Sequence, residues 1–202
     1  MKVLLSVLRE FADLPNDADA IATALNSLGM AVESTEEVGV PVTGVVTARI
    51  VRTERHPDAD KVTRCFVDSG DGREMHVWCG ATNMGPGDVV PLATIGTTMP
   101  DGRAIARRGI LGIDSEGMLC SPVELGISAE AGGLLILPSD TPLGIDPFVA
   151  LGIEHDVVFD LDLTRNRPEC WGHAGIARDL AAHFKVGYRG PRLATINRGD
   201  TR

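Results

Sequence analysis

Short apolar runs separated by turn residues dominate the middle of the chain. The runs with the composition and length of strands cover residues 42–51, 63–67, 75–78, 88–93, 104–107 and 134–137. Gly, Pro, Asp or Asn closes each run, and the sequence Asp-Ser-Gly-Asp-Gly at residues 68–72 is a strong turn signal between two of them. This alternation of short strands and turns predicts a small antiparallel β-barrel.

The first 39 residues predict a small βα unit. Residues 3–8 have the composition of a strand. Asn16 is a good N-cap for a helix that places Ile21, Leu25 and Leu28 on one face and ends at Gly29. Residues 31–38 are expected to return as an extended segment. Such a unit cannot bury its apolar face unaided, so it requires a partner elsewhere in the chain.

The second end of the chain supplies that partner. Residues 157–163 alternate apolar and polar positions, which predicts a strand with one buried face. In the helix expected at residues 172–184, the apolar face consists of Ile176, Ala177, Leu180 and Phe184.

The predicted fold class is mainly β with an α+β part. Residues 1–39 plus 151–190 form a small discontinuous α+β domain, and residues 40–150 form a five-stranded barrel inserted into it. Residues 191–202, rich in arginine, predict a flexible tail.

Composition is that of an ordinary globular protein, with 44% hydrophobic and 23% charged residues in a chain of 202. No apolar run approaches the roughly 20 residues that span a bilayer. Near the N-terminus, Arg9 and Glu10 interrupt the apolar residues too early for a signal peptide. We therefore expect a cytoplasmic protein without a membrane partner.

The net charge of −9 is unevenly distributed. Residues 40–110 carry 9 basic and 8 acidic side chains, whereas residues 111–163 carry no basic and 10 acidic side chains. Residues 164–202 carry 8 basic and 3 acidic side chains. A nucleic acid could approach only residues 40–110 or the C-terminal part, and strong non-specific binding, including binding to DNA, is not expected.

The four cysteines, Cys65, Cys79, Cys120 and Cys170, are scattered and form no CxxC pair. They predict reduced, buried thiols. A zinc site with His76 or His173 lacks any supporting ligand spacing, so no metal and no cofactor are expected.

Three ordered motifs carry a family resemblance. They are His-Pro-Asp-Ala-Asp-Lys at residues 56–61, Cys-Gly-Ala-Thr-Asn at residues 79–83, and Ser-Glu-Gly-Met-Leu-Cys-Ser-Pro-Val-Glu-Leu-Gly at residues 115–126. Together they resemble the OB-fold tRNA-binding domain attached to several aminoacyl-tRNA synthetases. Residues 1–33 and 157–182 resemble the segments that flank this domain in the bacterial phenylalanyl-tRNA synthetase beta chain.

The chain departs from the family at several positions. Arg165 stands where the family has Pro, Val7 where it has Trp, and Ala31 where it has Glu. Leu111-Gly112 replaces an Arg-Gly of the family. These changes are typical of a diverged paralogue.

The candidate tRNA-binding residues are polar or basic positions in the barrel segment. They are Lys61, Arg64, Asn83, Arg103, Arg107, Arg108 and Ser121. Arginine forks suit phosphate and stack on bases. Barrel aromatics are restricted to Phe66 and Trp78 in the predicted strands, so shape and backbone contacts should dominate RNA recognition.

Alternatives remain at several of these positions. The His56 to Lys61 segment can be a polar turn, a metal or acid–base cluster, or a loop that leads to the RNA. Asn83 can bind a base or close a loop. Met118 and Leu119 are expected to pack in the barrel, with Ser121 and Glu124 fixing a loop.

The leading functional hypothesis is a tRNA-binding module without a catalytic site of its own. The resemblance implies a synthetase subunit that lacks the catalytic and editing modules, so a ligase activity of this chain is undecided. An alpha-type synthetase subunit or a second copy of the chain is a further candidate partner. The alternatives are a diverged paralogue whose barrel binds or transforms a small molecule, and an assembly adaptor.

Overall fold

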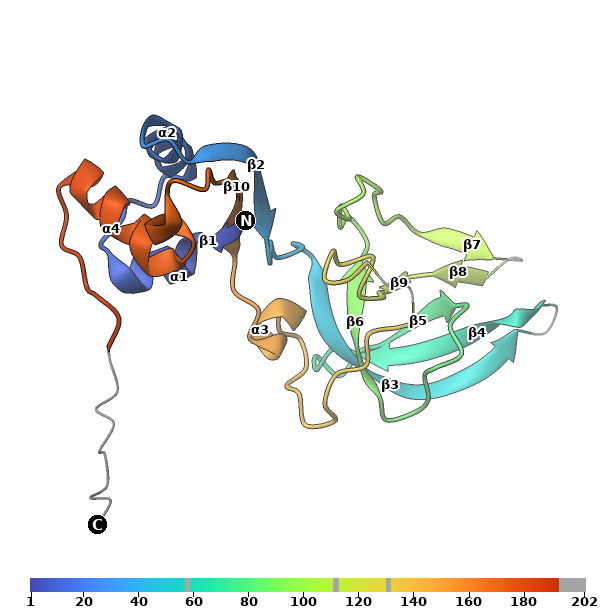
Figure 1. Ribbon diagram of the computed structural model, residues 1–202. Coiled ribbons are helices and arrows are strands. Elements are labelled where there is room, and N and C mark those ends of the chain that lie inside the picture. The colour runs from blue at the N-terminus through green and yellow to red at the C-terminus, as the bar shows by residue number, and fades with distance from the viewer. Residues whose placement is uncertain (57–58, 111–112, 130–131, 193–202) are drawn as a thin grey trace, which may run out of the picture. The chain divides into compact units, whose positions relative to one another are not determined.

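The computed structural model describes residues 1–56, 59–110, 113–129 and 132–192 (Figure 1). The chain divides into two compact units. One unit joins residues 1–38 with residues from 155 onward, and the other comprises residues 39–154. None of the helices in the described ranges is long and apolar enough to cross a membrane.

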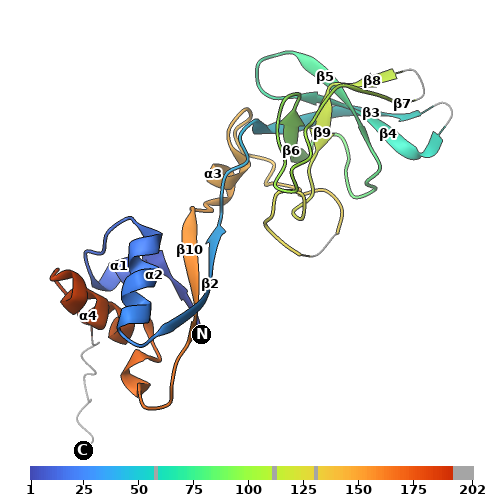
Figure 2. The ribbon, with the colours of Figure 1, turned by 90° about the horizontal axis from the view of Figure 1, so that it is seen from above.

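The unit made from both chain ends has a three-stranded antiparallel sheet in the order β1-β10-β2. Its elements are β1 (Lys2–Leu4), α1 (Leu5–Phe11), α2 (Ala18–Ser27), β2 (Ala31–Val38), β10 (Asp156–Asp162), a 3-10 turn (Pro168–Cys170) and α4 (His173–Phe184). The helices α1, α2 and α4 lie on one face of the sheet (Figures 1 and 2). Alternate residues of β10, Val157, Phe159 and Leu161, are buried against them, as the alternating pattern predicted.

The first strand is shorter than the apolar run predicted. The strand ends at Leu4, and residues from Leu5 form α1. Leu5 and Leu8 lie three residues apart and are both buried, whereas Ser6 is exposed. Because a helix puts residues i and i+3 on one face, the same apolar residues fill the core better as a helix.

The helix α2 begins one residue later than predicted. Asp17, not Asn16, is its N-cap, and the Asp17 carboxylate accepts a hydrogen bond from the Ala20 amide at 3.0 Å. Ile21 and Leu25 are fully buried, as expected. After the helix, Gly29 adopts a φ of +79°, which glycine takes without steric cost.

Arg167 joins three parts of this unit. Its guanidinium donates to the Leu28 carbonyl at 2.7 Å, to the Glu169 carboxylate at 2.6 Å and to the Asp179 carboxylate at 2.5 Å. The hydrogen bond to Glu169 is the main cause that raises the pKa of Arg167 above its ordinary value. Arg167 thus fixes the C-terminal end of α2 to the loop and to α4.

The second unit is a nearly closed five-stranded antiparallel barrel, which confirms the predicted OB-fold class. The sheet order is β5-β4-β3-β6-β9. Its elements are β3 (Val45–His56), β4 (Ala59–Asp68), β5 (Glu74–Cys79), β6 (Val89–Thr94), the hairpin β7 (Arg108–Ile110) and β8 (Ile113–Ser115), β9 (Gly117–Leu119) and α3 (Pro147–Leu151). The Glu116 amide donates to the His76 carbonyl at 2.9 Å, which links β5 to the start of β9 and helps to close the sheet.

The barrel interior is apolar. Its buried residues include Ala48, Ile50, Cys65, Val67, Val77, Val90, Leu92, Leu119 and Leu134. Gly117 permits close packing of β9 on β6, because a Cβ there would lie 2.7 Å from the Ala93 carbonyl oxygen. Leu119 is buried in this core and Met118 packs against a neighbouring apolar cluster, which confirms that both residues pack in the barrel.

Two predicted strands of the barrel are single bridges instead. In residues 104–107 only Ala104 pairs, with Thr98, and in residues 134–137 only Leu137 pairs, with Val89. The predictions were wrong because an apolar run shows that some side chains are buried, such as Ile105 and Leu137, but not that its backbone forms a continuous ladder with a neighbour. Sequence patterns also missed the hairpin β7–β8, which is close to the ends of β3 and β4 (Figures 1 and 2).

Candidate nucleic-acid interface

The outer face of β3, β4 and β5 gathers cationic and aromatic side chains. On β4, Cys65 and Val67 face the core, so the alternate positions Arg64 and Phe66 lie on the opposite, outer face. Across the strand pair, Arg64 is opposite Trp78, and Phe66 is opposite His76. Antiparallel partners project to the same side of a sheet, so these residues form one surface.

A β-bulge brings Arg52 to the same surface. The pairing of β3 with β4 shifts between Ile50, which pairs with Val67, and Arg52, which pairs with Phe66. Ile50 is fully buried, and simple alternation would place Arg52 on its face, toward the core. The extra residue, Val51, reverses the alternation and turns Arg52 outward.

Arg52, Phe66, Arg64 and Trp78 form a stacked row, which we call the arginine–aromatic ladder. The guanidinium carbon of Arg52 lies 3.3 Å from the centroid of the Phe66 ring. The Arg64 guanidinium carbon lies 4.7 Å from the Phe66 centroid and 5.8 Å from that of Trp78. These distances are within the range of cation–π attraction, so the aromatic rings fix the guanidinium planes.

Carboxylates flank the ladder. Glu54 forms ion pairs with Arg52 and, at 3.9 Å, with Arg64. Glu74 accepts a hydrogen bond from Arg52 at 2.9 Å, which is the main cause that raises the pKa of Arg52. The Nε atom of Arg64 is buried and has no hydrogen-bond partner in the described part of the chain. Arg64 is therefore the less fully satisfied of the two arginines.

A second group of charges attaches the hairpin to β5. Glu116 accepts a hydrogen bond from the His76 amide at 3.2 Å and pairs with Arg73 at 3.3 Å and Arg107 at 3.9 Å. The His76 ring also hydrogen-bonds the Asp114 carbonyl. Predicted site residue Arg107 is thus placed beside the ladder strands, with its charge shared with Glu116 and Asp114.

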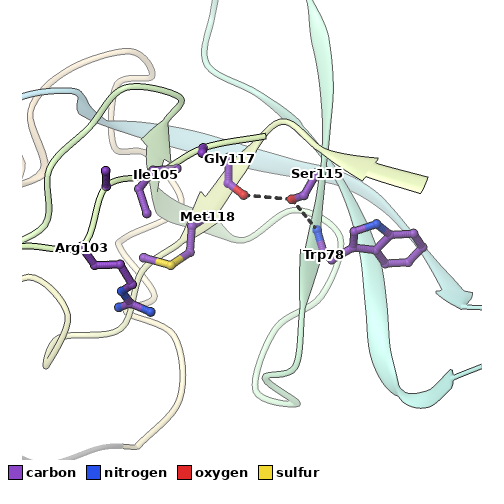
Figure 3. Close-up of a pocket in the computed structure, with 8 residues that line it drawn as sticks. Trp78, Arg103, Ile105, Ser115, Gly117 and Met118 are labelled. Carbon is purple, nitrogen blue, oxygen red and sulfur yellow. Dashed lines mark hydrogen bonds between the residues drawn. The ribbon is translucent and has the colours of Figure 1, made fainter. Parts of the chain in front are cut away.

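Arg103 lies at a small hollow beside Trp78, shown in Figure 3. It pairs with Asp101 at 3.3 Å and Glu124 at 3.5 Å. Met118, Ile105 and Ser115 form walls of the hollow, whose volume is about 140 Å³. The Ser115 hydroxyl accepts from the Trp78 amide and donates to the Gly117 carbonyl.

Ser121 and Asn83 are engaged in loop structure. The Glu124 carboxylate accepts from the Ser121 amide at 2.8 Å and from its hydroxyl at 2.9 Å, while the Ser121 hydroxyl accepts from the Glu124 amide. This confirms that the two residues fix a loop. The Asn83 side chain donates to the Leu134 carbonyl and accepts from the Leu134 amide, both at 3.0 Å. This geometry favours the loop-closing alternative for Asn83.

Two candidate positions have undescribed side chains. Lys61 belongs to β4 and Arg108 to β7, but both side chains lie outside what the structure describes. The same holds for the side chains of residues 56–60, so the three alternatives for the His56 to Lys61 segment remain predictions.

Sequence analysis also missed Arg52. The only signal in the sequence was the spacing of Arg52 from Arg64 and Phe66 along the two predicted strands. The bulge in β3 changes the pairing register, so this spacing alone does not show that the three residues meet.

The thiols of the barrel are buried, as predicted. Burial raises the pKa of Cys65 and of Cys120 to about 12. The pKa of Cys79 is also raised, mainly by burial, which argues against a nucleophile there. Within the described residues, one group of potential metal ligands occurs, Glu169, Cys170 and Asp179. Because Arg167 donates hydrogen bonds to all three, the group is an ion-pair network around a guanidinium.

Comparison with known proteins agrees with the motif analysis. Residues 45–146 match the family described as putative tRNA binding domain. The chain is 42% identical over 199 residues to the phenylalanine–tRNA ligase beta subunit of Anaeromyxobacter dehalogenans, covering 98% of this chain and 25% of that protein. For the Syntrophotalea carbinolica subunit the identity is 43% over 182 residues, covering 90% and 22%. For the Geobacter sulfurreducens subunit it is 41% over 201 residues, covering 99% and 25%.

These matches confirm the family resemblance. The similarity is to the N-terminal region of the beta subunits. The chain spans about a quarter of the length of these relatives.

Proposed function

Because this chain belongs to the family of putative tRNA-binding domains, we propose that it binds folded tRNA through the outer face of β3, β4 and β5. OB-folds bind oligonucleotides on the corresponding strands and on the loops beside them. The observation that carries the proposal is the arginine–aromatic ladder, in which Phe66 and Trp78 fix the guanidinium groups of Arg52 and Arg64.

Arg64 is the central phosphate contact in this proposal. Its side chain is 24% exposed, and its ion pair with Glu54 is long, at 3.9 Å. A phosphate oxygen can therefore form a charge-assisted hydrogen bond with a terminal nitrogen of this guanidinium. Arg103 and Arg107 would extend the contact toward the hairpin. We include Lys61 and Arg108 as contacts to the phosphate backbone of the RNA, because Lys61 belongs to β4 and Arg108 belongs to β7.

Folded RNA is favoured over an unstructured strand. The two aromatic rings of the ladder are 7% exposed each, so they offer little free surface on which successive bases could stack. The acidic partners of the arginines also oppose loose phosphate binding. Recognition would therefore depend on phosphates presented in a fixed geometry, as in a folded RNA.

The relatives suggest the setting of this activity. Their names identify them as beta subunits of phenylalanine–tRNA ligases, so we propose that the chain delivers or retains tRNA for such an enzyme in the cytoplasm. The partner would be an alpha-type subunit or a second copy of the chain. We also propose that residues 1–39 plus 151–190 act as one discontinuous domain, which the division into two compact units supports.

A filter-binding titration with bulk tRNA tests the proposal. At about 50 mM salt the chain should bind, and raising the salt to about 200 mM should weaken binding, because phosphate contacts release counterions. Arg64→Gln should reduce the slope of log affinity against log salt by about one. Arg178→Gln is the matched control, since Arg178 is an exposed, ion-paired arginine of the other unit. If the chain binds tRNA at neither salt concentration, or binds it equally well at both, the proposal is refuted.

A further inference from the structure

The hollow beside Trp78 continues the arginine–aromatic ladder. Trp78 is the last member of the ladder, and it also lines the hollow (Figure 3). RNA that contacts Arg64 would therefore pass close to the opening of the hollow.

The walls of the hollow are apolar with one polar group. Ile105 is 7% exposed and packs in the apolar cluster next to the barrel interior, and Met118 lines the hollow from β9. Ser115, which is 6% exposed, has its hydroxyl fixed by the Trp78 amide and the Gly117 carbonyl. A hydroxyl oxygen has two lone pairs, so Ser115 can accept one further hydrogen bond.

The edge of the hollow carries a cation. Arg103 lines it, with its guanidinium paired to Asp101 and Glu124. An apolar interior, one hydrogen-bond acceptor and a cation at the edge match the parts of a nucleotide, whose base is flat and largely apolar and whose phosphate is anionic.

The volume restricts the ligand. Sites for drug-sized molecules have roughly 300–1,000 Å³, whereas this hollow has about 140 Å³. It has room for one ring system and not for a complete dinucleotide cofactor.

We propose that the hollow receives a single unpaired base of the bound RNA. The base packs against Met118 and Ile105, an amino group of the base donates to the Ser115 hydroxyl, and Arg103 contacts the adjoining phosphate (Figure 3). This inference rests on the proposed function, because the ladder is what brings RNA to the hollow.

The first test is occlusion of the hollow. Ala106 is an exposed residue of its lining, so Ala106→Phe fills the opening without disturbing the core. Ala129→Phe is the matched control at an exposed alanine of the same unit. Thermal unfolding should confirm that both variants fold. Ala106→Phe should weaken bulk tRNA binding by about tenfold, which corresponds to about 1.4 kcal/mol, and Ala129→Phe should leave binding unchanged.

The second test is direct. Trp78 and Trp171 are the two tryptophans of the chain, so Trp171→Phe makes Trp78 the sole indole reporter. Adenosine or uridine monophosphate should change the Trp78 emission, and ribose 5-phosphate, which lacks a base, should not. Ala106→Phe in this background should abolish the response.

The outcomes separate the two proposals. If the unmodified chain does not bind tRNA, the proposed function fails and this inference fails with it. If the chain binds tRNA but Ala106→Phe binds as tightly as Ala129→Phe, only the base site is refuted. An equal response of Trp78 to ribose 5-phosphate would also overturn it, because that result shows an anion site alone.

Discussion

The guanidinium carbon of Arg52 lies 3.3 Å from the centroid of the Phe66 ring, directly across the β3–β4 pair. This contact exists because the bulge at Val51 turns Arg52 away from the core. It makes the arginine–aromatic ladder a preorganised surface, in which the cations are held before any ligand arrives.

Replacement of Arg52 should separate stacking from charge. Arg52→Lys keeps the charge but loses the planar fork, so tRNA affinity should fall severalfold with little change in salt dependence. Arg52→Gln should also reduce the slope of log affinity against log salt by about one. Filter binding over a salt series measures both. Equal slopes for the two variants would show that Arg52 makes no phosphate contact.

Removal of the Glu54 carboxylate should strengthen RNA binding. Glu54 pairs with Arg52 and Arg64, so Glu54→Gln releases Arg64 for phosphate and leaves Arg52 paired with Glu74 alone. We expect affinity for unstructured RNA to rise more than affinity for tRNA, which lowers selectivity. Glu33→Gln in β2 is the control, because it makes the same change in net charge, and Glu33 has no ion pair among the described residues. If both variants gain equally, the net charge and not the Glu54 pairs is responsible.

Asn83 should matter for stability and not for RNA contact. Asn83→Ala removes both hydrogen bonds to the Leu134 backbone, and the free energy of unfolding should fall by about 1–3 kcal/mol. Urea unfolding measures this change, with Asn166→Ala in an exposed loop as the control. The tRNA affinity of the folded variant should be unchanged. A loss of affinity without a loss of stability would instead favour a base contact.

The buried thiols should make stability depend on alkaline pH. The pKa values of Cys65 and Cys120 are about 12 in the folded state. In an unfolded chain the pKa of a cysteine is about 8.5. The folded state therefore binds protons more tightly, and its stabilisation is complete below about pH 8.5 and is lost as pH rises toward 12.

Urea unfolding at about pH 7.5 and pH 10 should detect this loss, up to about 1.4 kcal/mol per pH unit for each thiol. The variant with Cys65→Ala and Cys120→Ala should be less stable at neutral pH but should show a smaller decrease with pH. Identical decreases in the two proteins would assign the effect to other groups.

Much of the fold follows from local patterns. The alternation of β10, the turn between β4 and β5, and the helical spacing of Ile176 and Leu180 each depend on residues a few positions apart. The three barrel motifs identify the family for a similar reason, since they recur in order along the chain. Boundaries were less accurate, because Asn16 and Asp17 are neighbouring residues that are both suitable caps, and in the structure it is the Asp17 carboxylate that accepts from the Ala20 amide.

The surface of the candidate site depended on contacts that no local pattern contains. Simple alternation assigns Arg52 to the core side, and the bulge at Val51 appears only when β3 pairs with β4. The sequence also shows nine basic residues in the barrel segment. It does not show that several of them form ion pairs with Glu54, Glu74 and Glu116. Local periodicity determined most of the strands, the scattered cysteines predicted buried thiols, and the ordered motifs identified the family. Tertiary structure decided which side chains meet, because strand pairing brings together residues that are far apart in the chain.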